Sequence, residues 1–173
     1  ILHELQKDGR ISITEIAEKV GSSRPTVTNR MKQLLESRSV TIEAGLNLAA
    51  AGYKMACVGL EVRNDDTRRK VEHILKICPR VLNVFRTPEK ANIHVAVWGE
   101  DDQTINSTIE SFRDLHDVDI VYTHYLGTPI HGDIGIKATP AQSEGTPCGK
   151  LCSECHRYEN KWCLGCPITV DYI

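Results

Sequence analysis

The chain has 173 residues, of which 40% are hydrophobic and 25% charged, and its formal net charge is −2. This length is enough for one large or two small domains, and the near-neutral charge requires any nucleic-acid-binding surface to be local. No apolar run approaches the roughly 20 residues of a membrane-spanning helix, and no secretory signal opens the chain. We therefore expect a cytoplasmic protein that does not contact a membrane.

The first 46 residues predict short helices joined by tight turns. Thr14 can cap a helix over residues 15–20, and Gly21 interrupts it. Ser23 can then cap a third helix with Pro25 in its first turn, which is a favoured way to start a helix. The buried face of this third helix is marked by apolar residues at helical spacing, namely Val27, Met31, Leu34 and Leu35.

The outer side of the third helix is polar and basic. Between residues 24 and 38 there are four basic residues and one acidic residue, a local charge of +3. The second helix of a helix-turn-helix lies in the major groove of DNA, where such side chains reach bases and phosphates. A solvated helix in a small bundle is the alternative. The candidate DNA contacts are Ser23, Arg24, Thr26, Thr28, Asn29, Arg30 and Lys32.

Beyond the third helix, the sequence predicts a small β wing. Val40 and Ile42 alternate with polar residues, and Gly45 supplies a turn. With the preceding helices, residues 1–46 are therefore expected to form a winged helix-turn-helix.

Residues 53–126 alternate strand and helix patterns in the order βαββαβ, which is a ferredoxin-like split motif. Strands are expected near residues 56–62, 81–86, 93–97 and 118–126. Helices are expected after residues 65–66 and 101–102, where aspartates can cap them. The fold class is therefore α+β. Residues 127–147, rich in glycine and proline, are expected to form a connecting arm.

Residues 148–173 contain five of the seven cysteines and predict a metal-binding module. Two Cys-x2-Cys pairs can clamp one tetrahedral Zn²⁺ ion. An iron–sulfur cluster is the alternative, because the Cys-x3-Cys-x2-Cys spacing and the closing Cys-Pro also occur in cluster proteins. Disulfides or free thiols are a third interpretation. The expected zinc ligands are Cys152, Cys155, Cys163 and Cys166, with Cys148 as a spare ligand or reactive thiol, while Cys57 and Cys78 are expected in the core.

The stretch LHELQKDGRISITEIAEKVGSSRPTVTNRMKQLLESRSV resembles the N-terminal domain of the Lrp/AsnC family, the leucine-responsive or feast/famine regulators. The SxxTVxxRxxxL pattern of the third helix and Gly52-Tyr53 before the next strand share this resemblance, which covers about residues 1–126. It implies a sequence-specific DNA-binding regulator, not an enzyme. It further implies dimers or higher oligomers on palindromic DNA, and control by a small effector, commonly an amino acid.

The loop from Thr87 to Asn92 corresponds to the effector loop of that family but departs from its pattern. The family's glycine is replaced, and Pro88 offers no N–H to a ligand. Thr87 and Asn92 are therefore effector candidates, with a purely structural hairpin as the alternative. The cysteines suggest a metal or redox signal in place of an amino acid.

Two alternative functions remain from the sequence. The metal can be only structural, in a regulator that responds to an amino acid. Enzymes of the same two-domain plan decarboxylate haem precursors and hold a tetrapyrrole with His and Arg. This chain has seven histidines but no tight His/Arg cluster.

Overall fold

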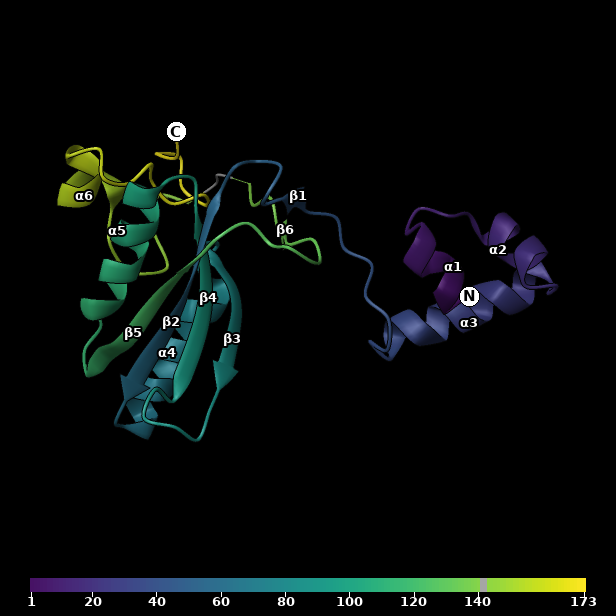
Figure 1. The fold of residues 1–173 in the computed structure, drawn as a ribbon, viewed down its shortest axis with the longest axis horizontal. Coiled ribbons are helices and arrows are strands. Elements are labelled where there is room, and N and C mark those ends of the chain that lie inside the picture. Colours follow the sequence, from purple (N-terminus) through teal and green to yellow (C-terminus); the bar gives the residue numbers. More distant parts are fainter. Residues whose placement is uncertain (141–142) are drawn as a thin grey trace. The chain divides into compact units, whose positions relative to one another are not determined.

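The computed structural model describes residues 1–140 and 143–173, which divide into two compact units, Ile1–Ala44 and Gly45–Ile173 (Figure 1). The first unit is helical, and the second contains the sheet together with the cysteine tail. The tail is therefore part of the second unit and not a separate body. In the described part of the chain, no helix is both long enough and apolar enough to cross a membrane.

The first unit consists of three helices, α1 (Leu2–Lys7), α2 (Ile13–Lys19) and α3 (Arg24–Glu36). All three contribute to one small core, and α2 and α3 supply its most buried side chains. Val27 and Met31 of α3 are buried as the helical spacing predicts, whereas Leu35 is exposed. The members of this core are Leu5, Ile16, Ala17, Val27 and Met31.

Helix caps fix the start of α2 and the turn between α2 and α3. Ser12, not Thr14, caps α2: its hydroxyl accepts from the Glu15 N–H at 3.2 Å, and the Glu15 carboxylate accepts from the Ser12 N–H at 3.0 Å. This reciprocal box outcompetes Thr14 because it satisfies two free backbone donors at once. Gly21 then has φ +62°, a left-handed conformation that glycine adopts easily, and Ser23 caps α3 as predicted.

The predicted β wing is wrong. Residues 37–45 contain no strand, and Val40 instead packs against the helical core. The next strand, β1 (Leu46–Asn47), pairs with β6 (Gly135–Ile136) of the second unit. A wing needs two strands that pair with each other, and the alternating residues 40–42 have no such partner nearby. The first unit is thus a helix-turn-helix without a wing.

The second unit is built on a four-stranded antiparallel sheet in the order β3-β4-β2-β5. Its strands are β2 (Lys54–Val62), β3 (Val81–Arg86), β4 (Ile93–Gly99) and β5 (Val118–Leu126). Two helices, α4 (Asp65–Ile77) and α5 (Asp102–Arg113), connect them. The order βαββαβ confirms the predicted ferredoxin-like motif.

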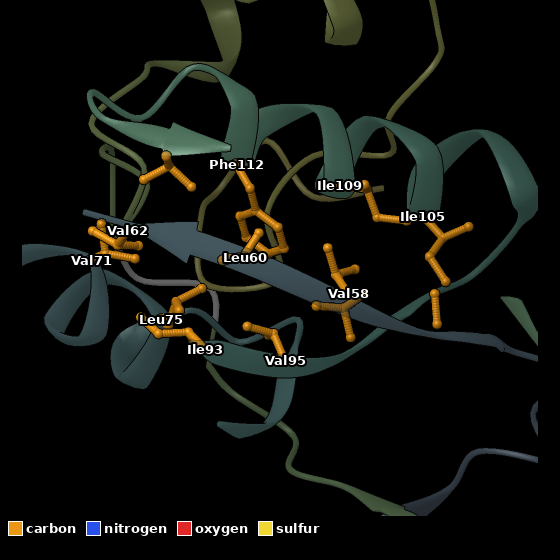
Figure 2. Packing of buried hydrophobic residues seen from close by; sticks show 13 residues of the cluster. Val58, Leu60, Val62, Val71, Leu75, Ile93, Val95, Ile105, Ile109 and Phe112 are labelled. Carbon is orange, nitrogen blue, oxygen red and sulfur yellow. The ribbon is translucent and has the colours of Figure 1, made fainter. Parts of the chain in front are cut away.

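Both helices cover the same face of this sheet, and the main core lies between the helices and the sheet (Figure 2). Val71 and Leu75 of α4 and Phe112 of α5 point at the central strands. The strand residues they meet, such as Leu60 and Ile93, are fully buried. The alternation that predicted the strands is therefore the alternation between core and open face.

Part of the predicted connecting arm is structured. Ile136 of β6 is buried and forms a second small core with Leu48 and Trp98. The Trp98 ring stacks on Tyr53 with centroids 5.3 Å apart. A glycine- and proline-rich composition marks turns, but it did not reveal that residues 135–136 return to pair with β1.

The tail contains a 3-10 turn, η1 (Cys152–Glu154), and a short helix, α6 (His156–Glu159). It packs on α5, as the adjoining ribbons in Figure 1 show, and the Ser107 hydroxyl donates to the Trp162 carbonyl at 2.6 Å. Residues 143 and 169 form a parallel bridge that joins the end of the connecting arm to the tail. Thr169 is fully buried there, and Arg80 of the sheet domain donates to the Gly165 carbonyl, so the tail is folded against the sheet domain.

Candidate functional site

The polar face of α3 is the first candidate site. All seven residues predicted to contact DNA are exposed, while Val27 and Met31 on the same helix are buried. The helix therefore presents its predicted side chains to solvent and its apolar stripe to the core. The exposed set is Ser23, Arg24, Thr26, Thr28, Asn29, Arg30 and Lys32.

Some of these side chains are already engaged within the helix. The Ser23 and Thr26 hydroxyls are hydrogen-bonded at 2.8 Å, and the Thr28 hydroxyl donates to the Arg24 carbonyl at 2.9 Å. In contrast, Arg24 and Arg30 make no ion pair with the described part of the chain. These two guanidinium groups are thus available to phosphates, which accept hydrogen bonds from arginine.

The second candidate site is a cavity of about 90 Å³ between the tail, α5 and the end of α4. Six of the seven cysteines line it, and we call it the cysteine cavity. Five come from the tail, and the sixth, Cys78, follows the last residue of α4. The six are Cys78, Cys148, Cys152, Cys155, Cys163 and Cys166.

All seven cysteines are free thiols, and three of those around the cavity have a raised pKa. Burial is the main cause for Cys78, Cys163 and Cys166, and it raises the pKa of Cys166 to about 12. Reactive cysteines have a lowered pKa, because the thiolate is the nucleophile. Cys78, Cys163 and Cys166 therefore do not have the lowered pKa of a redox nucleophile.

The four predicted zinc ligands line this one cavity but do not converge on a point. Within residues 1–140 and 143–173, no three His, Cys, Asp or Glu side chains are arranged to hold a single metal ion. The zinc site on Cys152, Cys155, Cys163 and Cys166 stays a prediction.

A buried arginine fixes the second cysteine pair to the sheet domain. Arg80 donates to Glu100 at 2.6 Å and to the Gly165 carbonyl at 2.7 Å, and it lies over the Trp98 ring at 5.2 Å. Gly165, between Cys163 and Cys166, has φ +90°, and a Cβ there would lie 2.8 Å from the Asp171 carbonyl oxygen. Only glycine fits this turn without strain.

Cys78 and Arg80 were missed by sequence reasoning. Cys78 has the helical spacing of a core residue, and Arg80 follows a helix-ending proline. Both residues are distant from the tail in sequence and meet it only through tertiary packing, so no sequence pattern pointed to them.

The loop predicted to bind an effector forms a closed hairpin. The Thr87 hydroxyl donates to the Ala91 carbonyl at 2.6 Å. The Asn92 amide donates to the Val62 carbonyl at 2.8 Å and accepts from the Val62 N–H at 3.0 Å. Both side chains thus bond to the chain's own backbone, which favours the structural interpretation of this loop.

Comparison with known proteins identifies the first unit. Residues 1–35 match the AsnC-type helix-turn-helix domain. The leucine-responsive regulatory protein of Rhizobium meliloti is 42% identical over 69 residues, which cover 38% of this chain and 44% of that relative. The HTH-type transcriptional regulator FL11 of Pyrococcus furiosus is 24% identical over 125 residues, which cover 71% of this chain and 82% of the relative.

Solved structures match most of the chain. A transcriptional regulator from Neisseria meningitidis in complex with L-methionine has a TM-score of 0.66 at 21% identity and covers 77% of this chain and 89% of its own. A feast or famine regulatory protein from M. tuberculosis, also with L-methionine, has a TM-score of 0.63 at 22% identity, with coverage of 76% and 90%. The chain thus has an AsnC-type helix-turn-helix, and its fold is shared with these transcription regulators.

Proposed function

We propose that the protein binds DNA sequence-specifically through α3 and regulates transcription in the cytoplasm. The observation that carries this proposal is the division of α3 into a buried apolar stripe and an exposed polar face on an AsnC-type helix-turn-helix. A recognition helix needs both faces, one to hold it on its domain and one to enter the major groove.

The exposed residues take different roles by their chemistry. Arg24, Arg30 and Lys32 contact phosphates, which position the protein without reading sequence. Thr26, Thr28 and Asn29 face the bases, where an asparagine amide can pair with adenine through two hydrogen bonds. Lys32 also lies 3.7 Å from Glu36, an exposed pair that contact with a phosphate can replace.

The test is a comparison of two variants on operator and unrelated DNA. Arg30→Ala should weaken binding to both sequences and lower the slope of log affinity against log salt by about 1. Asn29→Ala should weaken operator binding by about 1–3 kcal/mol and relax specificity at one base pair. Arg63→Ala in the sheet domain, which also removes an exposed arginine, is the matched control. Unchanged operator affinity in both α3 variants would exclude this docking.

Self-association is part of the proposal, because one recognition helix addresses only one half-site. The sheet face opposite the helices supports it. Phe85 lies 58% exposed on that face beside its strand partner His94, and Leu126 lies beside Met55. Exposed apolar side chains on this sheet face are suited to association with a second copy. Footprinting of the operator complex should show two protected half-sites, and a single half-site would exclude the dimer.

The proposed regulatory signal concerns two other sites, the tail cysteines and the loop from Thr87 to Asn92. We propose that metal or redox state at the tail cysteines adjusts DNA affinity, since the effector-loop side chains Thr87 and Asn92 are bonded to the backbone of Ala91 and Val62. The alternative, an amino-acid effector with a purely structural metal, takes its support from the L-methionine complexes of two structural neighbours. Measuring the same operator affinity with a chelator and with single amino acids distinguishes them. A response to amino acids alone would exclude the metal signal.

A further inference from the structure

The cysteine cavity joins thiols from two distant parts of the sequence. Cys78 lies at the end of α4, and the nearest of the other five, Cys148, is 70 residues further on. Six thiols line this one cavity, more than the four that either a tetrahedral zinc ion or a single iron–sulfur cluster uses, so only some of them can be ligands. The sheet domain and the tail therefore both contribute thiols to one site. The remaining cysteine, Cys57, lies on strand β2 and does not line the cavity.

The size of the cavity argues against a single ion. In a tetrahedral zinc site the Zn–S bonds of about 2.3 Å place the sulfurs about 3.8 Å apart, in contact with one another. Such a site leaves no free volume at its centre. The cysteine cavity has about 90 Å³, whereas a single water needs roughly 10–15 Å³ measured in the same way. No three of its thiols are placed for one ion.

The charges around the cavity suit a negatively charged guest. Arg80, Lys150 and Arg157 all line it. Their partners are two carboxylates: Arg80 pairs with Glu100, and Lys150 and Arg157 share Asp114. Three cations against two carboxylates leave one positive charge uncompensated within this group. An inorganic cluster held by thiolates is anionic, and nearby cations stabilise it.

We infer that the cysteine cavity binds an iron–sulfur cluster, with Cys78 of the sheet domain as one ligand and tail cysteines as the others. Ferrous and ferric ions and inorganic sulfide are the components that must be supplied, and the ferric ions account for the oxidised irons of the cluster. Each ligating thiol gives its proton to solvent and an electron pair to an iron, so no thiol is oxidised in the step. Both common cluster types take four cysteine thiolates.

This ligand set has a structural consequence. Because Cys78 belongs to the sheet domain and the other ligands to the tail, the cluster links the tail to α4 covalently through metal–sulfur bonds. The docking that Arg80 begins at Gly165 is completed by the cluster. Loss of the cluster therefore loosens the tail from the domain.

The first test uses the full chain purified without oxygen, or reconstituted with ferrous and ferric iron and sulfide. The expected result is iron and acid-labile sulfide in equal amounts, with visible absorption that dithionite bleaches. Zinc without labile sulfide would overturn the inference in favour of a zinc site. Protein that takes up no metal under either condition would overturn it as well.

The second test asks whether Cys78 is a ligand. Cys78→Ser should lose the iron, the labile sulfide and the visible absorption, whereas Cys57→Ser should keep all three. Circular dichroism and the tryptophan transition in urea establish that both variants are folded. If Cys78→Ser fails to fold, Cys78→Ala and its reconstitution after refolding give the same readout. A folded Cys78 variant with a full complement of iron and sulfide would overturn the assignment.

Discussion

The recognition helix and the cysteine cavity are built in opposite ways. Every predicted DNA contact lies within ten residues of the others, on one helix whose caps and apolar stripe are local in sequence. The cavity depends on contacts such as Arg80 with Gly165, across 85 residues. The residues of a site on one helix can be predicted from the helical periodicity of the sequence. The residues of a site formed by tertiary packing cannot.

The same contrast applies to charge. The arginines of α3 are exposed and make no ion pair within the described residues, so their charges stay solvated and are free to bind phosphates. Arg80 is buried, and its charge requires Glu100. Exposed charges serve an external partner, whereas the buried pair holds one part of the molecule to another.

The largest effect should come from Arg80→Ala. Removing one member of a buried ion pair costs about 3–5 kcal/mol, because the other charge is left without its partner. Both tryptophans lie in the second unit, and Arg80 covers the Trp98 ring, so tryptophan fluorescence during urea unfolding reports this loss. Arg63→Ala, which breaks the exposed pair with Asp119, should cost less than about 1 kcal/mol. Equal effects of the two substitutions would show that Arg80 does not hold the unit together.

Much of the fold was predictable from sequence because its signals are periodic. Alternation in β2 and helical spacing in α4 and α5 predict the ferredoxin-like order, and Ser23 with Pro25 predicts the start of α3. The wing prediction was wrong because alternation over residues 40–42 indicates that a strand is possible but not which strand will pair with it. The first strand after this segment begins at Leu46, which pairs with Ile136 of β6.

The sites divide along the same line. The exposure of Arg30 and Asn29 follows from their place opposite Val27 and Met31 on a helix. The tail cysteines were recognised by spacing, but their number around the cavity was not, because Cys78 has the spacing of a core residue. Which thiols meet depends on how the tail packs against α5, and sequence periodicity carries no information on that packing.

An intermediate effect confined to the first unit should follow from Val27→Ala. Val27 is fully buried, and removing its two methyl groups should cost about 2 kcal/mol once the cavity is included. A unit of 44 residues has little stability to spare, so DNA binding should fail at a lower temperature while the tryptophan transition stays unchanged. The control Val20→Ala removes a side chain that is 40% exposed and should leave both readouts unchanged. A shifted tryptophan transition in Val27→Ala would mean that the two units do not unfold independently.

The smallest effect should come from Asp114→Asn, which weakens the contact between α5 and the tail. Burial raises the pKa of Asp114, but hydrogen bonds from Lys150 and Arg157 outweigh it and hold the pKa below the ordinary value of 3.8. A carboxylate with a lowered pKa stabilises the folded state above its ordinary pKa and loses that contribution as the pH falls through the folded value. The side chain is 39% exposed, so solvent screening limits the cost at neutral pH to about 0.5 kcal/mol.

Limited proteolysis of the tail measures this contact. The Asp114→Asn variant should be cut faster than the unmodified protein at neutral pH, and the difference should shrink as the pH falls below 3.8. Asp117→Asn is the matched control, because Asp117 pairs only with the exposed His116 among the described residues. A difference that persists in acid would show that Asp114 holds the tail by shape and not by charge.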